Sequence, residues 1–176
     1  MHILDILQNG LEAGASRIEL AIEEDISKDL LRITITDNGR GMDKVTLDRV
    51  RDPFFTTRTT RRVGLGIPLF AATAECCNGS FTIESAPGEG TTIAATFQHS
   101  HIDRPPIGDM VTTLLSVILG QEHVDLHYHH KVNERDFEFN TEEVRARLGE
   151  VPLSHPVVRK WLREYLQEGL SALHSS

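Results

Sequence analysis

The chain has 176 residues and a mass of 19.7 kDa, which suits one domain of ordinary size or one domain with an appendage. Acidic residues outnumber basic ones by 26 to 18, and this balance argues against a protein that binds nucleic acid through clustered Lys and Arg. No apolar run reaches the roughly 18 residues of a membrane-spanning helix, and the N-terminus has no signal-peptide pattern, so the sequence predicts a cytoplasmic protein without a membrane span.

The first half of the chain alternates between helical and strand-like hydrophobic spacing. In chain order it predicts a helix (3–13), two half-buried strands (17–24 and 30–37), a short helix with Asp43 as its N-cap, a loop (52–68), a helix with Pro68 in its first turn, and a hairpin (strands 80–85 and 91–98). The helix after Pro68 is apolar nearly all round, so we expect it to be buried on all sides. Asn78 and Gly79 mark its end.

The composition changes after Gln98, where the polar and proline-containing residues 99–109 predict a linker. Beyond it the pattern predicts a helix (110–119), a strand (124–132), a tight turn, a strand (137–140), a short helix that begins at Thr141 and an amphipathic last helix (154–170). The sequence therefore divides into a first domain (1–98), the linker and a small αββα extension (110–176).

Histidines recur in the first strand of this extension. His123, Asp125, His127 and His129 alternate on one face of it, with His130 on the opposite face. Imidazole and carboxylate groups at this spacing can reach one metal ion, but the solvent-exposed face of a hairpin is the simpler interpretation.

Four segments of the first domain together describe a nucleotide site: the helix face of Asp5, Asn9 and Glu12, then DNGRG at 37–41, GLG at 64–66 and GEGTT at 88–92. A carboxylate at a strand end, Asp37, can accept a hydrogen bond from the exocyclic amine of adenine. Glycines let the backbone approach a purine ring or phosphate oxygens closely. Asn9 offers a neutral oxygen to Mg²⁺, and Asp5, one helical turn away, could orient or deprotonate a water.

These segments resemble the conserved boxes of the GHKL or Bergerat-fold ATPases, which include gyrase, the heat-shock chaperone, histidine kinases and MutL. The stretch DILQNGLEAGASRI (5–18) resembles the N-box, DNGRGM the G1 box, DPFFTTR the F-box of histidine kinases, VGLGI the G2 box, and ESAPGEGTTIAATF the final hairpin. The resemblance covers roughly residues 2–98. It implies an α/β (α+β) two-layer sandwich of the Bergerat type, with a mixed sheet and helices on one face.

The resemblance also implies a role for each matching residue. Asn9 would bind Mg²⁺, and Asp37 would read the adenine of ATP or ADP, helped through water by Thr91. Gly39, Gly41 and Met42 would line the adenine pocket. The remaining roles fall on the stretch that would form the ATP lid and the G2 box: an anchoring Phe54, a phosphate-contacting Arg58 (with Arg61 and Arg62 as further candidates), and Gly64, Leu65 and Gly66 around the phosphates. The alternative for these arginines is a solvated basic loop.

Three departures from the family pattern bear on the function. Asp5 stands where the MutL-like branch has a glutamate general base, so hydrolysis is expected to be slow or absent. The strand and helix that usually precede the N-box are missing, which leaves a sheet edge exposed, or covered by the C-terminal part or by a partner chain. No phosphoacceptor hairpin precedes the ATPase region, as a complete sensor kinase requires.

The sequence thus predicts an ATP- and Mg²⁺-binding protein that works as a stand-alone ATPase or protein kinase on a separate protein partner. The alternative is a catalytically weak nucleotide-binding switch that regulates a partner. A clamp of the mismatch-repair or topoisomerase kind is disfavoured by the acidic balance and the absent transducer domain. A homodimer is compatible with the sequence.

Overall fold

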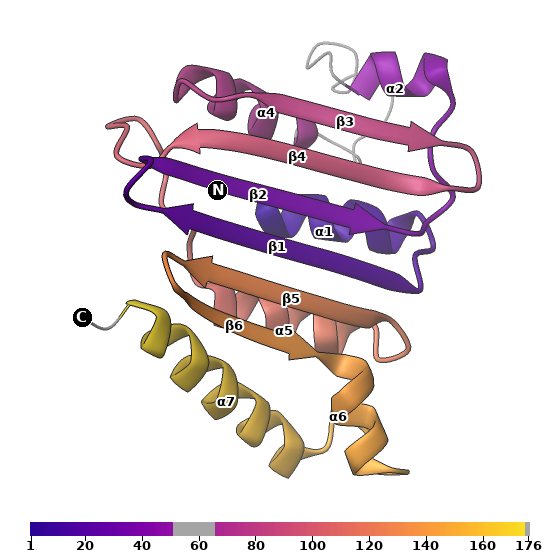
Figure 1. Cartoon of the computed structure of the whole chain (residues 1–176). Coiled ribbons are helices and arrows are strands. Elements are labelled where there is room, and N and C mark those ends of the chain that lie inside the picture. Colours follow the sequence, from indigo (N-terminus) through magenta and orange to yellow (C-terminus); the bar gives the residue numbers. More distant parts are fainter. Residues whose placement is uncertain (51–65, 175–176) are drawn as a thin grey trace.

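The computed structural model describes residues 1–50 and 66–174 of the chain. Its centre is one six-stranded mixed sheet with the strand order β3-β4-β2-β1-β5-β6 (Figure 1). The strands are β1 (Arg17–Asp25), β2 (Leu30–Asp37), β3 (Phe81–Ala86), β4 (Gly90–Gln98), β5 (Asp125–Val132) and β6 (Arg135–Asn140). The helices are α1 (Ile3–Glu12), α2 (Lys44–Val50), α4 (Gly66–Cys76), α5 (Met110–Gly120), α6 (Thr141–Leu148) and α7 (Pro156–His174).

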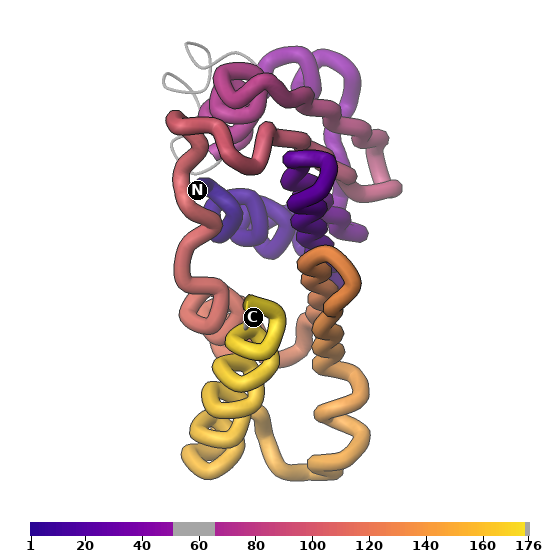
Figure 2. Tube along the Cα trace, turned by 60° about the vertical axis from the view of Figure 1, so that its left-hand side comes forward, coloured from indigo at the N-terminus to yellow at the C-terminus, as the bar shows by residue number. Residues whose placement is uncertain are grey.

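The main helices cover one face of this sheet. Figure 2 shows α1, α5 and α7 on one side of the strands, and α4 contacts β3 and β4. The strand patterns explain this arrangement, because β1 and β2 bury every second side chain and leave the intervening charged or polar ones outside. The α/β fold that the resemblance implied, with a mixed sheet and helices on one face, is confirmed.

The C-terminal part continues the sheet of the first half. Strand β5 pairs in parallel with β1 from Arg17 opposite Asp125 to Glu24 opposite Val132, so the backbone of β1 has a partner on both sides. One hydrophobic cluster joins the two parts, with Leu20 of β1 and Leu126 of β5 among its members. The sequence left open whether this sheet edge is exposed, covered by the C-terminal part or covered by a partner chain. The structure shows that the C-terminal part covers it.

Some local expectations were wrong. Helix α4 is not buried all round: its side chain Leu69 is 39% exposed, and Glu75 is also exposed. Helix α6 does begin at Thr141, as expected, and the Asn140 side chain caps it by accepting from the amide of Glu142. Strand β6 begins earlier than expected, at Arg135, because Asn133 adopts a left-handed φ of 53° and closes the turn within the NERD sequence.

Residues 99–109 run along the helix layer from β4 to α5 (Figure 2). They are held at several points: the amide and hydroxyl of Ser100 donate to the carboxylate of Asp29, and the Met1 amino group donates to the carbonyl of Pro106. The expected division into a first domain, a linker and an extension stays a prediction. Among the described helices, none is both long and apolar enough to cross a membrane.

Candidate nucleotide site

Asp37 ends β2, directly opposite Thr91 of β4. Its Oδ1 accepts a hydrogen bond of 2.8 Å from the amide of Gly39. Burial raises the pKa of Asp37, and the backbone amides of Gly39 and Thr91 counter this only in part. The carboxylate is therefore a half-buried acceptor at a strand end, as the sequence predicted.

Helix α1 packs directly on this carboxylate through a glycine. A Cβ placed on Gly10 would lie 3.1 Å from Cβ and 3.2 Å from Oδ2 of Asp37, so a larger residue would crowd the acid. Gly39 is as tightly placed, since a Cβ there would lie 2.8 Å from Cβ of Ala13, at the end of α1. The N-box helix and the DNG turn thus pack closely together, because glycine stands at both contact points.

The loop after Asp37 is fixed to the β3–β4 hairpin. Gly41 has a φ of 71°, and a Cβ on it would lie 1.9 Å from the carbonyl oxygen of Ala86, which only glycine avoids. The hydroxyl of Ser85 accepts from the amide of Met42 at 2.8 Å and lies 2.9 Å from the hydroxyl of Thr91. The structure therefore brings Gly41, Met42 and Thr91 together beside Asp37.

Asn38, which was not among the predicted site residues, fixes the same loop to the start of β1. Its Oδ1 accepts from the amides of Ser16 and Arg17, both at 2.9 Å, and its Nδ2 donates to the hydroxyl of Ser16. Asparagine commonly bonds nearby backbone in turns, so the DNG sequence carried a signal for this role. Ser85 was also missed, and its position before APGEG gave no comparable signal.

Asn9 lies one residue before Gly10 on α1. Its Nδ2 atom is buried and has no hydrogen-bond partner among the described residues. Buried amide groups are normally paired, so an orphan of this kind points to a missing ligand. A half-turn about Cβ–Cγ exchanges the nitrogen for the oxygen, and an unpaired amide oxygen fits the neutral donor that Mg²⁺ accepts.

Asp5 lies one turn before Asn9, next to the start of α4. A Cβ on Gly66, the first residue of α4, would lie 3.0 Å from Cβ of Asp5. The amino-terminal end of α4, where unpaired N–H groups and the helix dipole favour an anion, is therefore beside the N-box helix. The Asp5 carboxylate itself is 58% exposed and lies 3.3 Å from Nδ1 of His2.

The remaining site predictions concern Phe54, Arg58, Gly64 and Leu65, together with Arg61 and Arg62. They lie outside the residues that the structure describes. Of the predicted residues, the structure brings together those of α1, the β2 end, the 38–42 loop, β4 and the start of α4.

Residues 2–101 match the family described as histidine kinase-, DNA gyrase B- and HSP90-like ATPases, which is more than half of the chain. The chain belongs to this ATPase family. Membership supports ATP binding and a kinase-family function, and domains of this family generally bind ATP or ADP with Mg²⁺.

Bacterial proteins similar to this chain include two that are named as kinases. The chain is 38% identical over 89 residues to the sensor protein kinase FleS of Pseudomonas aeruginosa, a match that covers 51% of this chain and 22% of FleS. It is 34% identical over 91 residues to the signal transduction histidine-protein kinase AtoS of Escherichia coli, covering 51% of this chain and 15% of AtoS. It is 30% identical over 118 residues to the non-motile and phage-resistance protein of Caulobacter vibrioides, covering 62% of this chain and 14% of that protein. The chain spans less than a quarter of each of these three relatives.

Proposed function

We propose that this member of the ATPase family binds Mg·ATP between α1, the 38–42 loop and α4, and transfers or releases its terminal phosphoryl group in service of a separate protein partner. The observation that carries this proposal is the contact of α1 with both parts of the proposed site. Gly10 lies against Asp37, where the base would bind, and Asp5 lies against Gly66, where the phosphates would bind.

Different residues of the proposed site bind the base and the phosphates. Asp37 accepts from the exocyclic amine of adenine, while Gly39 and Gly41 let the loop beside it pack against Ala13 and Ala86. The amides at the start of α4 face the phosphates. Asn9 holds Mg²⁺, which when bound neutralises phosphate charge. Asp5 orients the attacking water or hydroxyl.

A second candidate function is a switch with negligible turnover, in which ATP and ADP favour different states of a partner-binding surface. The observation that favours it is the placement of Asp5, whose short and largely exposed carboxylate already has His2 as a neighbour. A general base needs hydrogen-bond reach to the water that it activates.

Phosphate release from Mg·ATP by the purified full chain separates the two functions. If the protein is an ATPase, we expect turnover that Asn9→Ala and Asp5→Ala each reduce by at least about 100-fold. Asn9→Ala removes a Mg²⁺ ligand, and Asp5→Ala removes a general base, a kind of group that contributes roughly 10²–10⁴-fold. Gln8→Ala is the matched control, because Gln8 is an exposed residue of the same helix. Tight ATP binding without turnover in the wild type would favour the switch. Failure to bind ATP would contradict both.

A further inference from the structure

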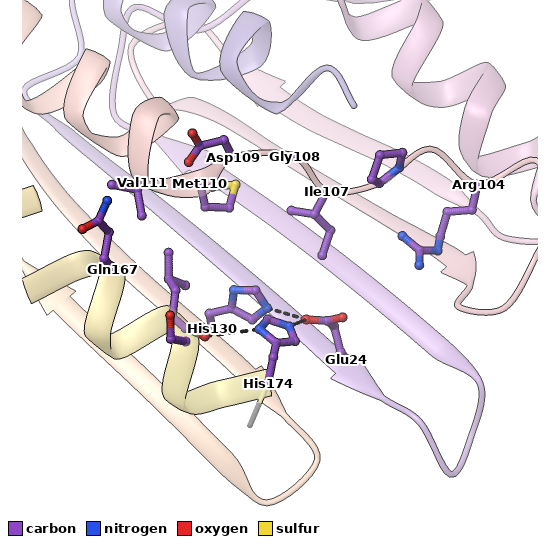
Figure 3. A pocket seen from close by; sticks show the side chains of 13 residues that line it. Glu24, Arg104, Ile107, Gly108, Asp109, Met110, Val111, His130, Gln167 and His174 are labelled. Carbon is purple, nitrogen blue, oxygen red and sulfur yellow. Dashed lines mark hydrogen bonds and ion pairs between the residues drawn. The ribbon is translucent and has the colours of Figure 1, made fainter. Parts of the chain in front are cut away.

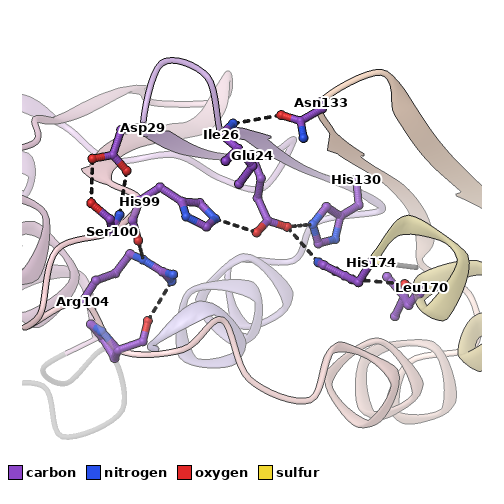
Figure 4. A network of polar contacts seen from close by, with 11 residues as sticks. Glu24, Ile26, Asp29, His99, Ser100, Arg104, His130, Asn133, Leu170 and His174 are labelled. Carbon is purple, nitrogen blue, oxygen red and sulfur yellow. Dashed lines mark hydrogen bonds and ion pairs between the residues drawn. The ribbon is translucent and has the colours of Figure 1, made fainter. Parts of the chain in front are cut away.

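A carboxylate and three imidazoles meet at the far end of β1. Glu24 Oε2 lies 2.6 Å from Nε2 of His130 and 3.2 Å from Nε2 of His174, and its Oε1 lies 3.0 Å from Nε2 of His99 (Figure 4). Glu24 is only 6% exposed and His130 only 2%. These groups come from β1, β5, the end of α7 and the residue after β4, so the fold gathers them from segments far apart in the sequence.

This cluster is distant from the nucleotide site. Ile18 is the partner of Asp37 in the sheet, and Glu24 lies six residues further along β1, about 20 Å away at the rise of a strand. A cavity of about 620 Å³ opens beside the cluster, lined by Glu24, His130 and His174 together with Arg104 and Met110 (Figure 3). Neither the family resemblance nor the proposed function uses this cavity.

Both ring nitrogens of His174 face oxygen atoms of other residues. Its Nδ1 lies 3.2 Å from the carbonyl oxygen of Leu170, which can only accept, so Nδ1 carries the proton. In a neutral imidazole Nε2 then bears a lone pair, and this lone pair faces the Glu24 carboxylate at 3.2 Å. Two electron-rich atoms at this distance are stable only when a proton or a metal ion lies between them.

The other two ligand groups are also set up for a metal. The Glu24 carboxylate is almost fully buried, and its Oε2 faces both His130 and His174. Nδ1 of His130 lies 2.6 Å from the hydroxyl of Tyr128. Metal-bound histidines usually have their second ring nitrogen held by a neighbour in this way.

We propose that Glu24, His130 and His174 bind a divalent transition-metal ion of the Zn²⁺ class, with the cavity open to a fourth donor. Their ligand atoms all lie within 4.8 Å of one another. Bonds of about 2.0–2.1 Å in a tetrahedral site place neighbouring ligand atoms roughly 3.3 Å apart. The Glu24–His174 distance of 3.2 Å fits this value, and the Glu24–His130 distance of 2.6 Å needs to open by about 0.7 Å. The metal would tie the end of α7 to β1 and β5.

Another group of three ligands offers an internal control. His129, Asp136 and Glu138 also lie within 4.8 Å of one another, but they are on the open face of the sheet and largely exposed. An exposed group with one imidazole lacks the burial and the fixed ring orientation of the Glu24 cluster. His129→Ala is therefore the matched control for His174→Ala.

The test is calorimetric titration of Zn²⁺ into the metal-free full chain. We expect one Zn²⁺ per chain, at least ten-fold weaker binding in His174→Ala, and unchanged binding in His129→Ala. The side chain of His174 is 54% exposed, so its loss is tolerable for the fold. As a second readout, Zn²⁺ should raise the melting temperature of the wild type and of His129→Ala but not of His174→Ala.

Three results would overturn the metal site. Absence of Zn²⁺ binding by the wild type would show that a proton, not a metal, lies between His174 and Glu24. Equal affinity in the wild type and His174→Ala would place any bound Zn²⁺ elsewhere. Loss of binding in His129→Ala would move the site to the open face of the sheet.

Discussion

At the scale of single residues, Asp37 at the end of β2 and Asp29 in the turn before β2 experience opposite environments. Burial raises the pKa of Asp37, so the fold disfavours its charged form. Hydrogen bonds from Ser100 and Gln98 lower the pKa of Asp29, so the fold favours its charged form. Above the ordinary pKa of an aspartate, the charge therefore costs stability at Asp37 and adds stability at Asp29.

This contrast predicts opposite effects of one substitution at the two sites. Asp37→Asn should weaken ATP binding roughly ten- to 100-fold, because the adenine amine loses a charged acceptor, while the melting temperature at neutral pH stays equal or rises. Asp29→Asn should leave ATP binding unchanged and lower the melting temperature. The backbone at Asp29, with a φ of 52°, suits asparagine equally well. Calorimetry and thermal unfolding measure both effects, and unchanged ATP affinity in Asp37→Asn would refute the adenine assignment.

Candidate residues for the chemistry were easier to propose from the sequence than the residues that position them. Asp37, Asn9 and the glycines follow from chemistry and spacing, because an acceptor, an amide oxygen and bare backbone are what a nucleotide needs. Ser85 could not be assigned in this way, since its hydrogen bond to the amide of Met42 exists only in the fold. The DNG turn did carry a signal for Asn38, but not for its partner Ser16. The Glu24 cluster was missed because its members are far apart in the chain.

At the scale of elements, the loop between β2 and α2 depends on close backbone contact with the β3–β4 hairpin. The amide of Gly88 donates to the carbonyl of Arg40 at 2.7 Å, and Gly41 lies against the carbonyl of Ala86. Gly41 and Gly88 both have left-handed φ angles, of 71° and 77°. They differ in their surroundings, because a Cβ on Gly88 would meet nothing within 4 Å.

Alanine substitutions at these two glycines therefore distinguish the cost of backbone strain from the cost of a steric collision. Gly88→Ala should cost about 1–2 kcal/mol, the penalty of a left-handed alanine, which lowers the melting temperature by roughly 2–8 °C in a chain of this size. Gly41→Ala should cost clearly more, since the added methyl collides with a carbonyl oxygen. Thermal unfolding of the two variants measures this difference, and equal losses would contradict the contact with Ala86.

Most helices and strands could be predicted from the hydrophobic period and the turn residues. The errors in these predictions have local causes. The end of the NERD turn was misplaced because Asn133 adopts a left-handed conformation that allows a shorter turn. The burial of α4 was overestimated because Leu69 and the alanines around it made an apolar pattern, although the helix turns one side to solvent.

At the scale of the whole molecule, the unexpected feature is that the extension joins the sheet. The alternation in β5 predicted a strand, but the sequence could not say that this strand pairs with β1 in parallel, since pairing partners far apart in the chain leave no local signal. The consequence is that the end of β1 which bears Glu24 contacts β5 and α7. The other end of the sheet carries Asp37 and the family site.

The central claim is that the pocket at Asp37 recognises adenine. The most direct test is calorimetric titration of the full chain, with Mg²⁺ present, with a non-hydrolysable ATP analogue and with the matching GTP analogue. An aspartate acceptor pairs with the amine of adenine but faces the carbonyl oxygen of guanine, so the account predicts binding of the ATP analogue at least about 100-fold tighter. Equal affinity for the two nucleotides, or tighter binding of the GTP analogue, would contradict it.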